Sequence, residues 1–125
     1  MTRRLLLVDD DDGVRLVAHA SLERVGGWAV TAVSSGADAL AAAAASPPDA
    51  ILLDVMMPGM DGPSTLAELQ RSDELAHIPV IFLTAKARSS QHDTLLGLGA
   101  IGVLVKPFDP MQLSNQVAAL LGFGP

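Results

Sequence analysis

The segment Ile51–Gly62, ILLDVMMPGMDG, joins a short apolar run to a carboxylate and a cluster of turn-forming residues. The run that begins at residue 50 is apolar up to Leu53, which is typical of a strand that is covered on both faces, as in a parallel sheet. Asp54 ends this run, and Pro58 and Gly59 then favour a turn. The segment therefore predicts a buried strand that delivers one carboxylate to the edge of a sheet.

Apolar runs of strand length alternate with helical patterns along the whole chain. The expected strands are Leu5–Val8, Trp28–Val33, Ala50–Leu53, Val80–Leu83 and Gly102–Val105. The expected helices are Gly13–Val25, Ser35–Ala45, Pro63–Leu69, Gln91–Leu98 and Pro110–Leu121. This alternation favours right-handed crossovers and a doubly wound α/β fold. The second expected strand, WAVTAV, is the most mixed in polarity and suits a position near an edge of the sheet.

The first expected helix has a clear helical period. Its apolar side is predicted from the spacing of Val14, Val17, Ala18, Ser21, Leu22 and Val25. Asp12 precedes the helix and is a candidate N-cap, and two glycines at positions 26 and 27 end it. Capping and solvation account for Asp11 and Asp12 without any direct role in chemistry.

Composition excludes several classes of function. The chain has 125 residues, which suits one domain, and it has no cysteine that could form a disulfide or bind a metal. Its net charge of −6 and its eight scattered Lys and Arg residues leave no basic face, so direct binding to nucleic acid is not expected. No apolar run approaches the roughly 18 residues of a membrane span. A cytoplasmic protein without a membrane segment is expected, and Met1 is expected to be a true N-terminus.

Polar residues follow the expected strands at their carboxyl ends. Asp9 and Asp10 follow the first strand, while Asp54, Thr84 and Lys106 end the third, fourth and fifth. In a doubly wound sheet these ends share one edge, where ligands bind. Two carboxylates about 4 Å apart repel by roughly 4 kcal/mol at an effective dielectric of 20, so the cluster calls for a cation. Oxygen ligands alone at an open site predict Mg²⁺.

Four segments resemble the signature stretches of response-regulator receiver domains, which include the chemotaxis response regulators. They are LLLVDDDDGVR, ILLDVMMPGMDG, VIFLTA and VLVKPF, and the resemblance runs from about Arg4 to Leu121. It implies a flavodoxin-like (βα)5 fold with a five-stranded parallel sheet in the order 2-1-3-4-5. It also implies one receiver domain over residues 1–125, with a core of about 4–121 and a tail or linker start at 122–125.

The resemblance implies a metal site with four ligands from the protein. Asp54 is implied as the phosphoacceptor and as a ligand of Mg²⁺. Asp10 is implied to bind the ion directly, and Asp9 directly or through water. The backbone carbonyl of Met56 completes the set.

The same resemblance implies two residues that contact the phosphoryl group. Lys106 is implied to pair with Asp54 in the free domain and with a phosphoryl oxygen after transfer, and Thr84 to donate its hydroxyl to another oxygen. The peptide bond before Pro107 is implied to be cis. These groups suit phosphoryl transfer, which depends on positioning and on charge neutralisation.

The implied function is to accept a phosphoryl group and to switch signalling output in a two-component system. The donor is a sensor histidine kinase or a histidine phosphotransfer protein, and the output is a downstream protein target or an effector domain outside this sequence. The domain is not expected to be an enzyme beyond promoting its own phosphorylation and dephosphorylation. A monomer is expected.

Two other functions remain open from the residues. The run Asp10–Val14 also matches the first motif of haloacid-dehalogenase-like phosphatases, with Thr84 and Lys106 as possible later motifs. That family needs an acidic pair after its lysine, and only Asp109 follows Lys106 here. A degenerate receiver that only binds partners is the other alternative, and the complete set of acidic, Thr and Lys residues disfavours it. Val103 departs from the resemblance, because receiver domains usually have an aromatic switch residue there.

Overall fold

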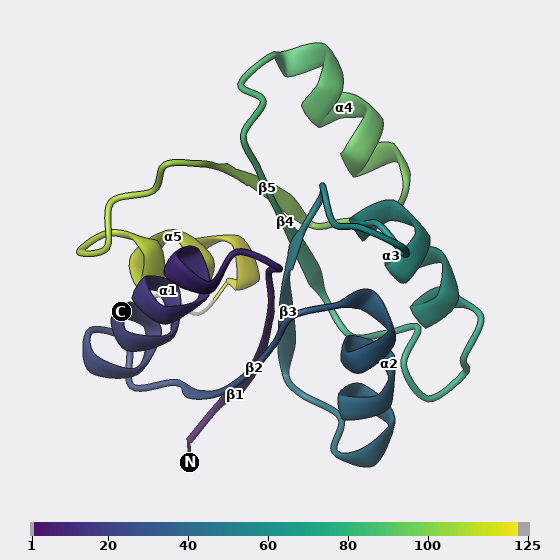
Figure 1. Cartoon of the computed structure of the whole chain (residues 1–125), viewed down its shortest axis with the longest axis horizontal. Helices are drawn as coiled ribbons and strands as arrows, with labels where there is room; N and C mark the ends of the chain where they lie inside the picture. Colours follow the sequence, from purple (N-terminus) through teal and green to yellow (C-terminus); the bar gives the residue numbers. More distant parts are fainter. Residues whose placement is uncertain (1, 123–125) are drawn as a thin grey trace.

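A computed structural model describes residues 2–122, and these form one five-stranded parallel sheet with helices on both faces (Figure 1). The strands are β1 (Arg4–Val8), β2 (Ala29–Val33), β3 (Ala50–Asp54), β4 (Val80–Thr84) and β5 (Gly102–Val105). Their order is β2-β1-β3-β4-β5, which confirms the predicted topology. The strand of mixed polarity, β2, lies at an edge as its sequence indicated, whereas every residue of β3 and β4 is buried.

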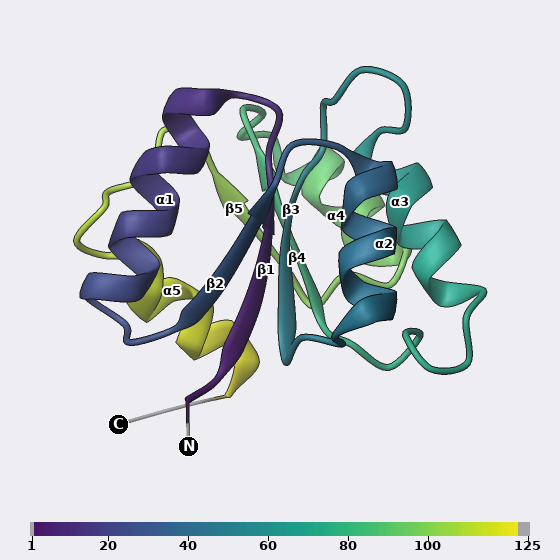
Figure 2. The ribbon, with the colours of Figure 1, turned by 60° about the horizontal axis from the view of Figure 1, so that its bottom comes forward.

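The helices divide between the two faces of the sheet (Figure 2). One face is covered by α1 (Asp12–Arg24) and α5 (Leu113–Leu121), and the other by α2 (Gly36–Ala45), α3 (Gly62–Gln70) and α4 (Ser89–Gly97). Successive strand residues point to opposite faces, so Leu52 packs with α1 and α5 while Leu53 packs with the other three helices. The fold therefore has two apolar cores, one on each side of the sheet.

The start of α1 differs by one residue from the prediction. Asp11, and not Asp12, is the N-cap, and its Oδ1 accepts a hydrogen bond of 2.9 Å from the backbone N–H of Val14. The predicted apolar side of this helix was also too wide, because Val17 and Val25 are 44% and 43% exposed. The helix meets the sheet through a narrow stripe around Ala18. The edge of such a stripe stays in contact with solvent.

The helices α2 and α3 also begin one residue away from the prediction, and two other helices begin two or three residues away. The helix α4 begins at Ser89, two residues early, because the carbonyl of Arg88 already accepts hydrogen bonds from Gln91 and His92. The helix α5 begins at Leu113, because Asp109 first holds residues 110–112 in a turn: its Oδ1 accepts from the N–H of Met111. None of these shifts changes the topology. The predicted tail reaches beyond Gly122 into residues that lie outside the described part of the chain.

Candidate functional site

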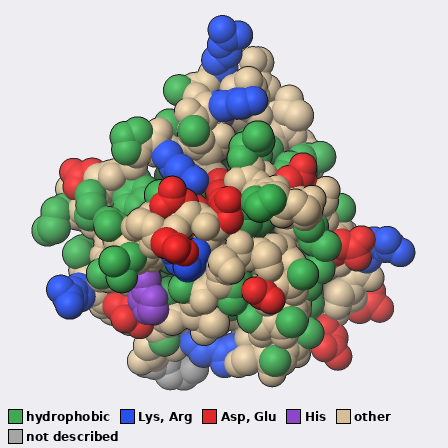
Figure 3. Space-filling view, in the orientation of Figure 1, with side chains coloured by type: hydrophobic (Ala, Val, Ile, Leu, Met, Phe, Trp, Pro, Cys, Tyr) green, Lys and Arg blue, Asp and Glu red, His purple; other side chains and the backbone are tan. Residues whose placement is uncertain are grey.

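Three carboxylates meet at the carboxyl ends of β1 and β3. Asp9 and Asp10 follow β1 directly, and Asp54 is the last residue of β3. Each of the three offers an oxygen within 4.8 Å of the others, with Asp9 and Asp54 buried and Asp10 exposed. Figure 3 shows acidic side chains gathered near the middle of this face, with basic side chains beside them. The parallel topology thus brings together residues that are 44 positions apart in the sequence.

Lys106 follows β5 and bridges two of these carboxylates. Its Nζ lies 3.1 Å from Oδ1 of Asp54, where it donates a hydrogen bond, and 3.0 Å from Oδ2 of Asp9. The second contact is an ion pair without hydrogen-bond geometry, so Oδ2 of Asp9 is buried without a hydrogen-bond partner within residues 2–122. The peptide bond between Lys106 and Pro107 is cis, as expected. The pair with Asp54 was predicted, whereas the pair with Asp9 was not.

Burial and charge shift the pKa of both ionisable partners. Burial raises the pKa of Asp54 to about 6; the hydrogen bond from Lys106 opposes this shift, and the negative charge of Asp9 adds to it. Asp54 therefore remains mostly ionised at pH 7. Burial would lower the pKa of Lys106, but the adjacent carboxylates of Asp9 and Asp54 outweigh burial and raise it above its ordinary value. The lysine is therefore a permanent cation in the site.

The four consecutive aspartates divide into two pairs with different surroundings. Asp9 is held in the site, where its Oδ1 accepts a hydrogen bond of 2.9 Å from the backbone N–H of Asp11. Asp11 turns its own carboxylate to the start of α1, and Asp12 forms an ion pair with Arg15. These contacts agree with the assignment of Asp11 and Asp12 to capping and solvation. They leave Asp9 and Asp10 as the pair that faces Asp54.

Thr84 and Met56 occupy the rim of the site. Thr84 ends β4, is 3% exposed, and accepts a hydrogen bond of 3.1 Å at its hydroxyl from the backbone N–H of Lys86. The carbonyl of Thr84 accepts from the N–H of Lys106 at 2.7 Å, which ties the ends of β4 and β5 together. Met56 follows β3 by two residues and its side chain is 66% exposed. Thr84 thus lies at the strand end where the sequence predicted it, and Met56 lies in the loop just after β3.

Gly62 allows α3 to begin directly beneath the site. Its N–H donates a hydrogen bond of 2.9 Å to the carbonyl of Val55. A Cβ atom at this position would collide with the carbonyl of Asp54 and would come within 2.9 Å of the Cα atom of Val55. A larger residue would push α3 or the loop after β3 outward, so this glycine allows α3 to begin close to the end of β3. Asp61, which the sequence placed in the turn, also caps α3 by accepting from the N–H of Ser64.

These residues fit a small hard cation. Every donor is an oxygen, which is the ligand type that Mg²⁺ prefers, and the ion usually binds one or two carboxylates and several waters. Asp10 is exposed and leaves room for such waters. The buried Oδ2 of Asp9 is the second feature that fits: its ion pair with Lys106 lacks hydrogen-bond geometry, so this anionic oxygen can still bind a second cation. The cluster is therefore a candidate magnesium site.

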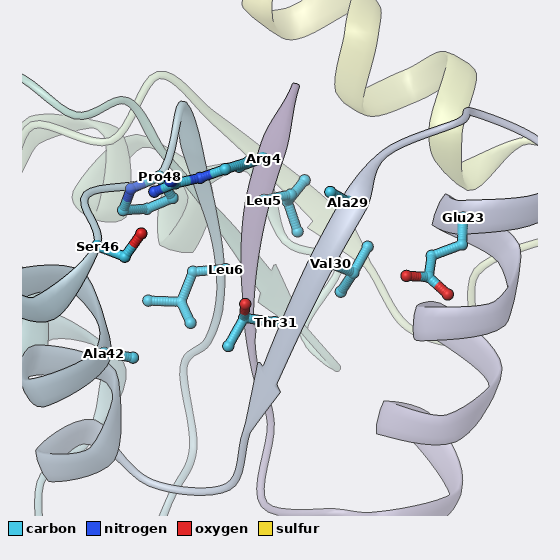
Figure 4. A pocket seen from close by; sticks show the side chains of 10 residues that line it. All are labelled: Arg4, Leu5, Leu6, Glu23, Ala29, Val30, Thr31, Ala42, Ser46 and Pro48. Atoms are coloured by element: carbon cyan, nitrogen blue, oxygen red, sulfur yellow. The ribbon is translucent and has the colours of Figure 1, made fainter. Parts of the chain in front are cut away.

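A hollow at the opposite end of the sheet is unrelated to this cluster (Figure 4). It encloses about 400 Å³ beside the edge strand β2 and is lined by Ala42, Ser46 and Pro48 together with residues at the starts of β1 and β2. The alanines of α2 are too small to fill the space against the sheet. Arg4 of β1 and Glu23 of α1 are the charged residues among those that line the hollow, and these two opposite charges form no metal-ligating or catalytic cluster, so we assign the hollow to loose packing.

The fold and the residues at the strand ends match those of a known protein family. The family model described as the response regulator receiver domain matches residues 5–118. The chain belongs to this receiver family. The model covers all five strands and most of α5, so the match includes every residue of the candidate site.

Relatives and solved structures agree with this assignment. The chain is 44% identical to the transcriptional regulatory protein CseB of Streptomyces avermitilis over 119 residues, which cover 94% of this chain and 48% of that protein. It is 37% identical to the alkaline phosphatase synthesis transcriptional regulatory protein PhoP of Bacillus subtilis, with 97% and 49% covered. The chain thus spans about half the length of these curated relatives.

Two solved structures show the same fold. The chemotaxis response regulator CheY4 of Vibrio cholerae superimposes with a TM-score of 0.90 at 28% identity and covers 96% of this chain and 99% of that one. The N-terminal domain of a response regulator receiver protein from Methanoculleus marisnigri gives a TM-score of 0.79 at 34% identity, with 97% and 98% covered. The domain is therefore a signalling module of two-component systems.

The sequence missed two contacts in the site. One is the ion pair between Lys106 and Asp9, and the other is the contact of Arg15 with the backbone of Asp9. The spacing of Asp12 and Arg15 in a helix could have indicated that their side chains meet, because residues three apart share one face. Nothing in the spacing indicates that the guanidinium also reaches back to the loop.

Proposed function

We propose that this domain accepts a phosphoryl group on Asp54 from a sensor histidine kinase or a histidine phosphotransfer protein. The observation that supports this most directly is the surroundings of the Asp54 carboxylate. It is buried at the end of β3, lies 3.1 Å from Nζ of Lys106, and is grouped with two further carboxylates that fit a metal ion. Such an arrangement suits a nucleophile whose product carries additional negative charge.

The proposed transfer forms one bond and breaks one bond. An oxygen of the Asp54 carboxylate attacks phosphorus, and the bond from phosphorus to the donor's histidine nitrogen breaks, with the electron pair leaving on that nitrogen. Asp54 requires no base, because with a pKa of about 6 it is mostly ionised at pH 7. The nucleophile is therefore ready without a prior proton transfer.

Neighbouring residues would stabilise the transferred group. The site would hold Mg²⁺ through Asp10, Asp54, the carbonyl of Met56, and Asp9 directly or through water, and the ion would supply positive charge beside the phosphoryl oxygens. Lys106 would move its hydrogen bond from Asp54 to a phosphoryl oxygen. Thr84 would donate its hydroxyl to another oxygen, because that hydroxyl only accepts in its contact with Lys86. All three act by positioning and charge, which is what phosphoryl transfer requires.

A phosphatase function receives less support. Haloacid-dehalogenase-like enzymes need a further acidic pair, and the acidic cluster among residues 2–122 contains only Asp9, Asp10 and Asp54. We therefore propose that the domain catalyses only its own phosphorylation and dephosphorylation. Sustained turnover of an aryl phosphate would support the enzyme instead. The complete set of acidic, Thr and Lys residues also argues against a degenerate receiver that only binds partners.

The output lies beyond this domain. The curated relatives are named as transcriptional regulators and are about twice as long as the matched region. We propose that this domain regulates either a separate protein or an effector domain outside the given sequence, and that residues 1–125 form one receiver domain.

The acidic surface, with a net charge of −6, disfavours direct binding to nucleic acid. Among residues 2–122 no helix is long and apolar enough to cross a bilayer. The proposal includes a monomer in the cytoplasm.

Phosphorylation by a small acyl phosphate tests the assignment of Asp54. The domain should gain one phosphoryl group in the presence of Mg²⁺ and none with a chelator, and peptide mapping should locate the group on Asp54. Asp54→Asn should abolish the modification. Asp61→Asn is the matched control, because it changes another aspartate of the same segment that caps α3. Normal yield from Asp54→Asn would show that another residue is the acceptor.

A further inference from the structure

Arg15 on the first helix reaches back to the loop that carries the acidic pair. Its side chain is only 23% exposed, and its Nη1 donates a hydrogen bond of 2.8 Å to the backbone carbonyl of Asp9. Its Nη2 forms an ion pair with Asp12, whose own side chain is 92% exposed. The guanidinium therefore spans from a partly buried carbonyl to a solvent-exposed carboxylate, and the two contacts hold it in one orientation.

The carbonyl that Arg15 contacts has a special place in the loop. It belongs to the peptide unit that joins Asp9 to Asp10, and this unit is planar. Fixing the direction of its oxygen therefore restrains the dihedral angle ψ of Asp9 together with φ of Asp10. These two angles set the direction of one candidate metal ligand relative to the other. A contact at this oxygen controls the geometry of the acidic pair without touching either carboxylate.

Asp9 is held at each of its other polar groups. Its N–H donates to the carbonyl of Val33 at 3.2 Å, its Oδ1 accepts from the N–H of Asp11, and its Oδ2 pairs with Lys106. Asp10 differs, because its side chain is exposed. The orientation of the peptide unit between them therefore determines where the exposed carboxylate of Asp10 lies relative to the fixed carboxylate of Asp9. Arg15 supplies that restraint from α1.

We infer that Arg15 is a positioning residue that orients the Asp9–Asp10 peptide so that both carboxylates can bind Mg²⁺ together. The inference rests on the proposed metal site. The charge of the guanidinium alone acts in the opposite direction, because a cation beside the site repels a metal ion. Removing Arg15 would therefore strengthen Mg²⁺ binding if only charge mattered, and it weakens binding if the orientation of the peptide matters more. The two effects differ in sign.

Mg²⁺ titration of the whole chain, followed by the backbone amide resonances of Asp10 and Lys106, tests the inference. Arg15→Gln should raise the dissociation constant for Mg²⁺ roughly tenfold, the scale on which groups that orient metal ligands act. Arg15→Lys keeps one donor and should recover part of this loss. Arg24→Gln removes the same charge from the far end of α1 and is the matched control, so its dissociation constant should stay within about twofold of the wild type.

The rate of phosphorylation separates positioning from a general structural effect. In Arg15→Gln, the Mg²⁺ concentration for half-maximal rate should rise by the same factor as the dissociation constant, while the rate at saturating Mg²⁺ stays within about twofold. Unchanged or tighter binding of Mg²⁺ to Arg15→Gln would overturn the inference. If that variant does not fold, Arg15→Lys decides, and wild-type affinity there would also overturn it. Failure of the wild type itself to bind Mg²⁺ would instead overturn the proposed function and this inference with it.

Discussion

The acidic site and the surface formed by α4, β5 and α5 differ sharply in charge. In the site, Lys106 contacts two carboxylates that are nearly inaccessible to solvent. After Asp109, by contrast, the sequence has no charged residue, and in the helix α4 Asp93 is the single acidic residue. Several exposed side chains on this second surface are apolar, namely Leu96, Leu98, Ile101 and Leu120.

This difference shows that phosphoryl transfer constrains the residues at the strand ends more than those on the second surface. Phosphoryl transfer needs an attacking oxygen, a metal site and a cation in one fixed geometry, and the strand ends supply all three. The surface formed by α4, β5 and α5 supplies no comparable set of charged groups. Val103, which lies there in place of the family's usual aromatic residue, is partly buried in β5 and too small to change position as an aromatic ring does. The acidic site therefore has the residue types that the family resemblance implied, while the surface of α4, β5 and α5 departs from the resemblance at Val103.

The largest expected effect concerns the acidic site. Asp10→Ala removes a proposed direct ligand and should raise the dissociation constant for Mg²⁺ about a hundredfold, which is about 2.7 kcal/mol. Asp11→Ala should change the dissociation constant for Mg²⁺ by less than about threefold, because the Asp11 side chain caps α1. Loss of this cap should lower the free energy of unfolding by about 1 kcal/mol. Calorimetric Mg²⁺ titration and thermal unfolding of both variants measure the two effects. Equal losses of affinity would show that the register within the four aspartates is wrong.

The stability of the domain without metal should depend on pH through Asp54. Its pKa is raised from 3.8 to about 6 in the folded domain, so the folded state binds this proton more tightly than the unfolded chain. The shift therefore costs stability above pH 6, and this cost disappears as the pH falls from about 6 towards 4. Asp54→Asn should be more stable than the wild type by on the order of 2 kcal/mol at pH 7, with little difference near pH 4.

Denaturant unfolding of both proteins with a chelator, between pH 4 and 7, measures this difference directly. Saturating Mg²⁺ should reverse the trend for the wild type, because the ion binds the ionised carboxylate. A constant difference between the two proteins across this range would show that Asp54 titrates normally in the folded domain.

A smaller effect is expected at the rim of the site. The side chain of Met56 is 66% exposed, and a thioether is only a weak hydrogen-bond acceptor, so it does little to orient a water that attacks the phosphoryl group. Met56→Asn should therefore speed the loss of phosphate by about threefold, or about 0.6 kcal/mol. Decay of the phosphorylated domain after removal of the donor measures the rate. Met57→Leu is a suitable control, because Met57 is buried in the core. A slower decay would contradict the role of water orientation.

The alternation of strand and helix patterns predicted the doubly wound α/β class, and the strand order followed from the resemblance of four segments to receiver domains. The sequence-based prediction was less accurate where several adjacent residues of the same type could fill one structural position. Any of four consecutive aspartates could cap α1, and only the packing of the helix decides that Asp11 does so. The exposure of Val17 likewise depends on how wide a stripe the sheet can cover.

Contacts across the fold were the hardest to predict. Lys106 was expected to pair with Asp54, but its distance of 3.0 Å to Asp9 depends on how closely β1 and β3 approach in space. The contact of Arg15 with the carbonyl of Asp9 depends on the turn between β1 and α1. Backbone acceptors are the same for every residue type, so sequence patterns do not reveal which of them a side chain will reach.

The smallest expected effect concerns the second surface, where phosphorylation should produce no salt-sensitive dimer. A salt-bridged dimer through this surface would need several exposed ion pairs, because each is worth only about 0–1 kcal/mol. The exposed positions of α5 include Asn115, Gln116 and Ala119, and Gln112 just before the helix is also exposed; none of them carries a charge.

Sedimentation with and without a phosphoryl mimic, at low and high salt, should therefore show a monomer in all four conditions. Self-association that strengthens with salt would indicate pairing through apolar side chains such as Leu96 and Leu120 on this surface, or Leu16 on α1, because salt does not screen apolar contacts. Leu120→Gln and Leu16→Gln would distinguish those two surfaces. A dimer that forms on activation and dissociates in salt would mean that charges elsewhere, such as Lys86 and Arg88 before α4, complete a network that α5 lacks.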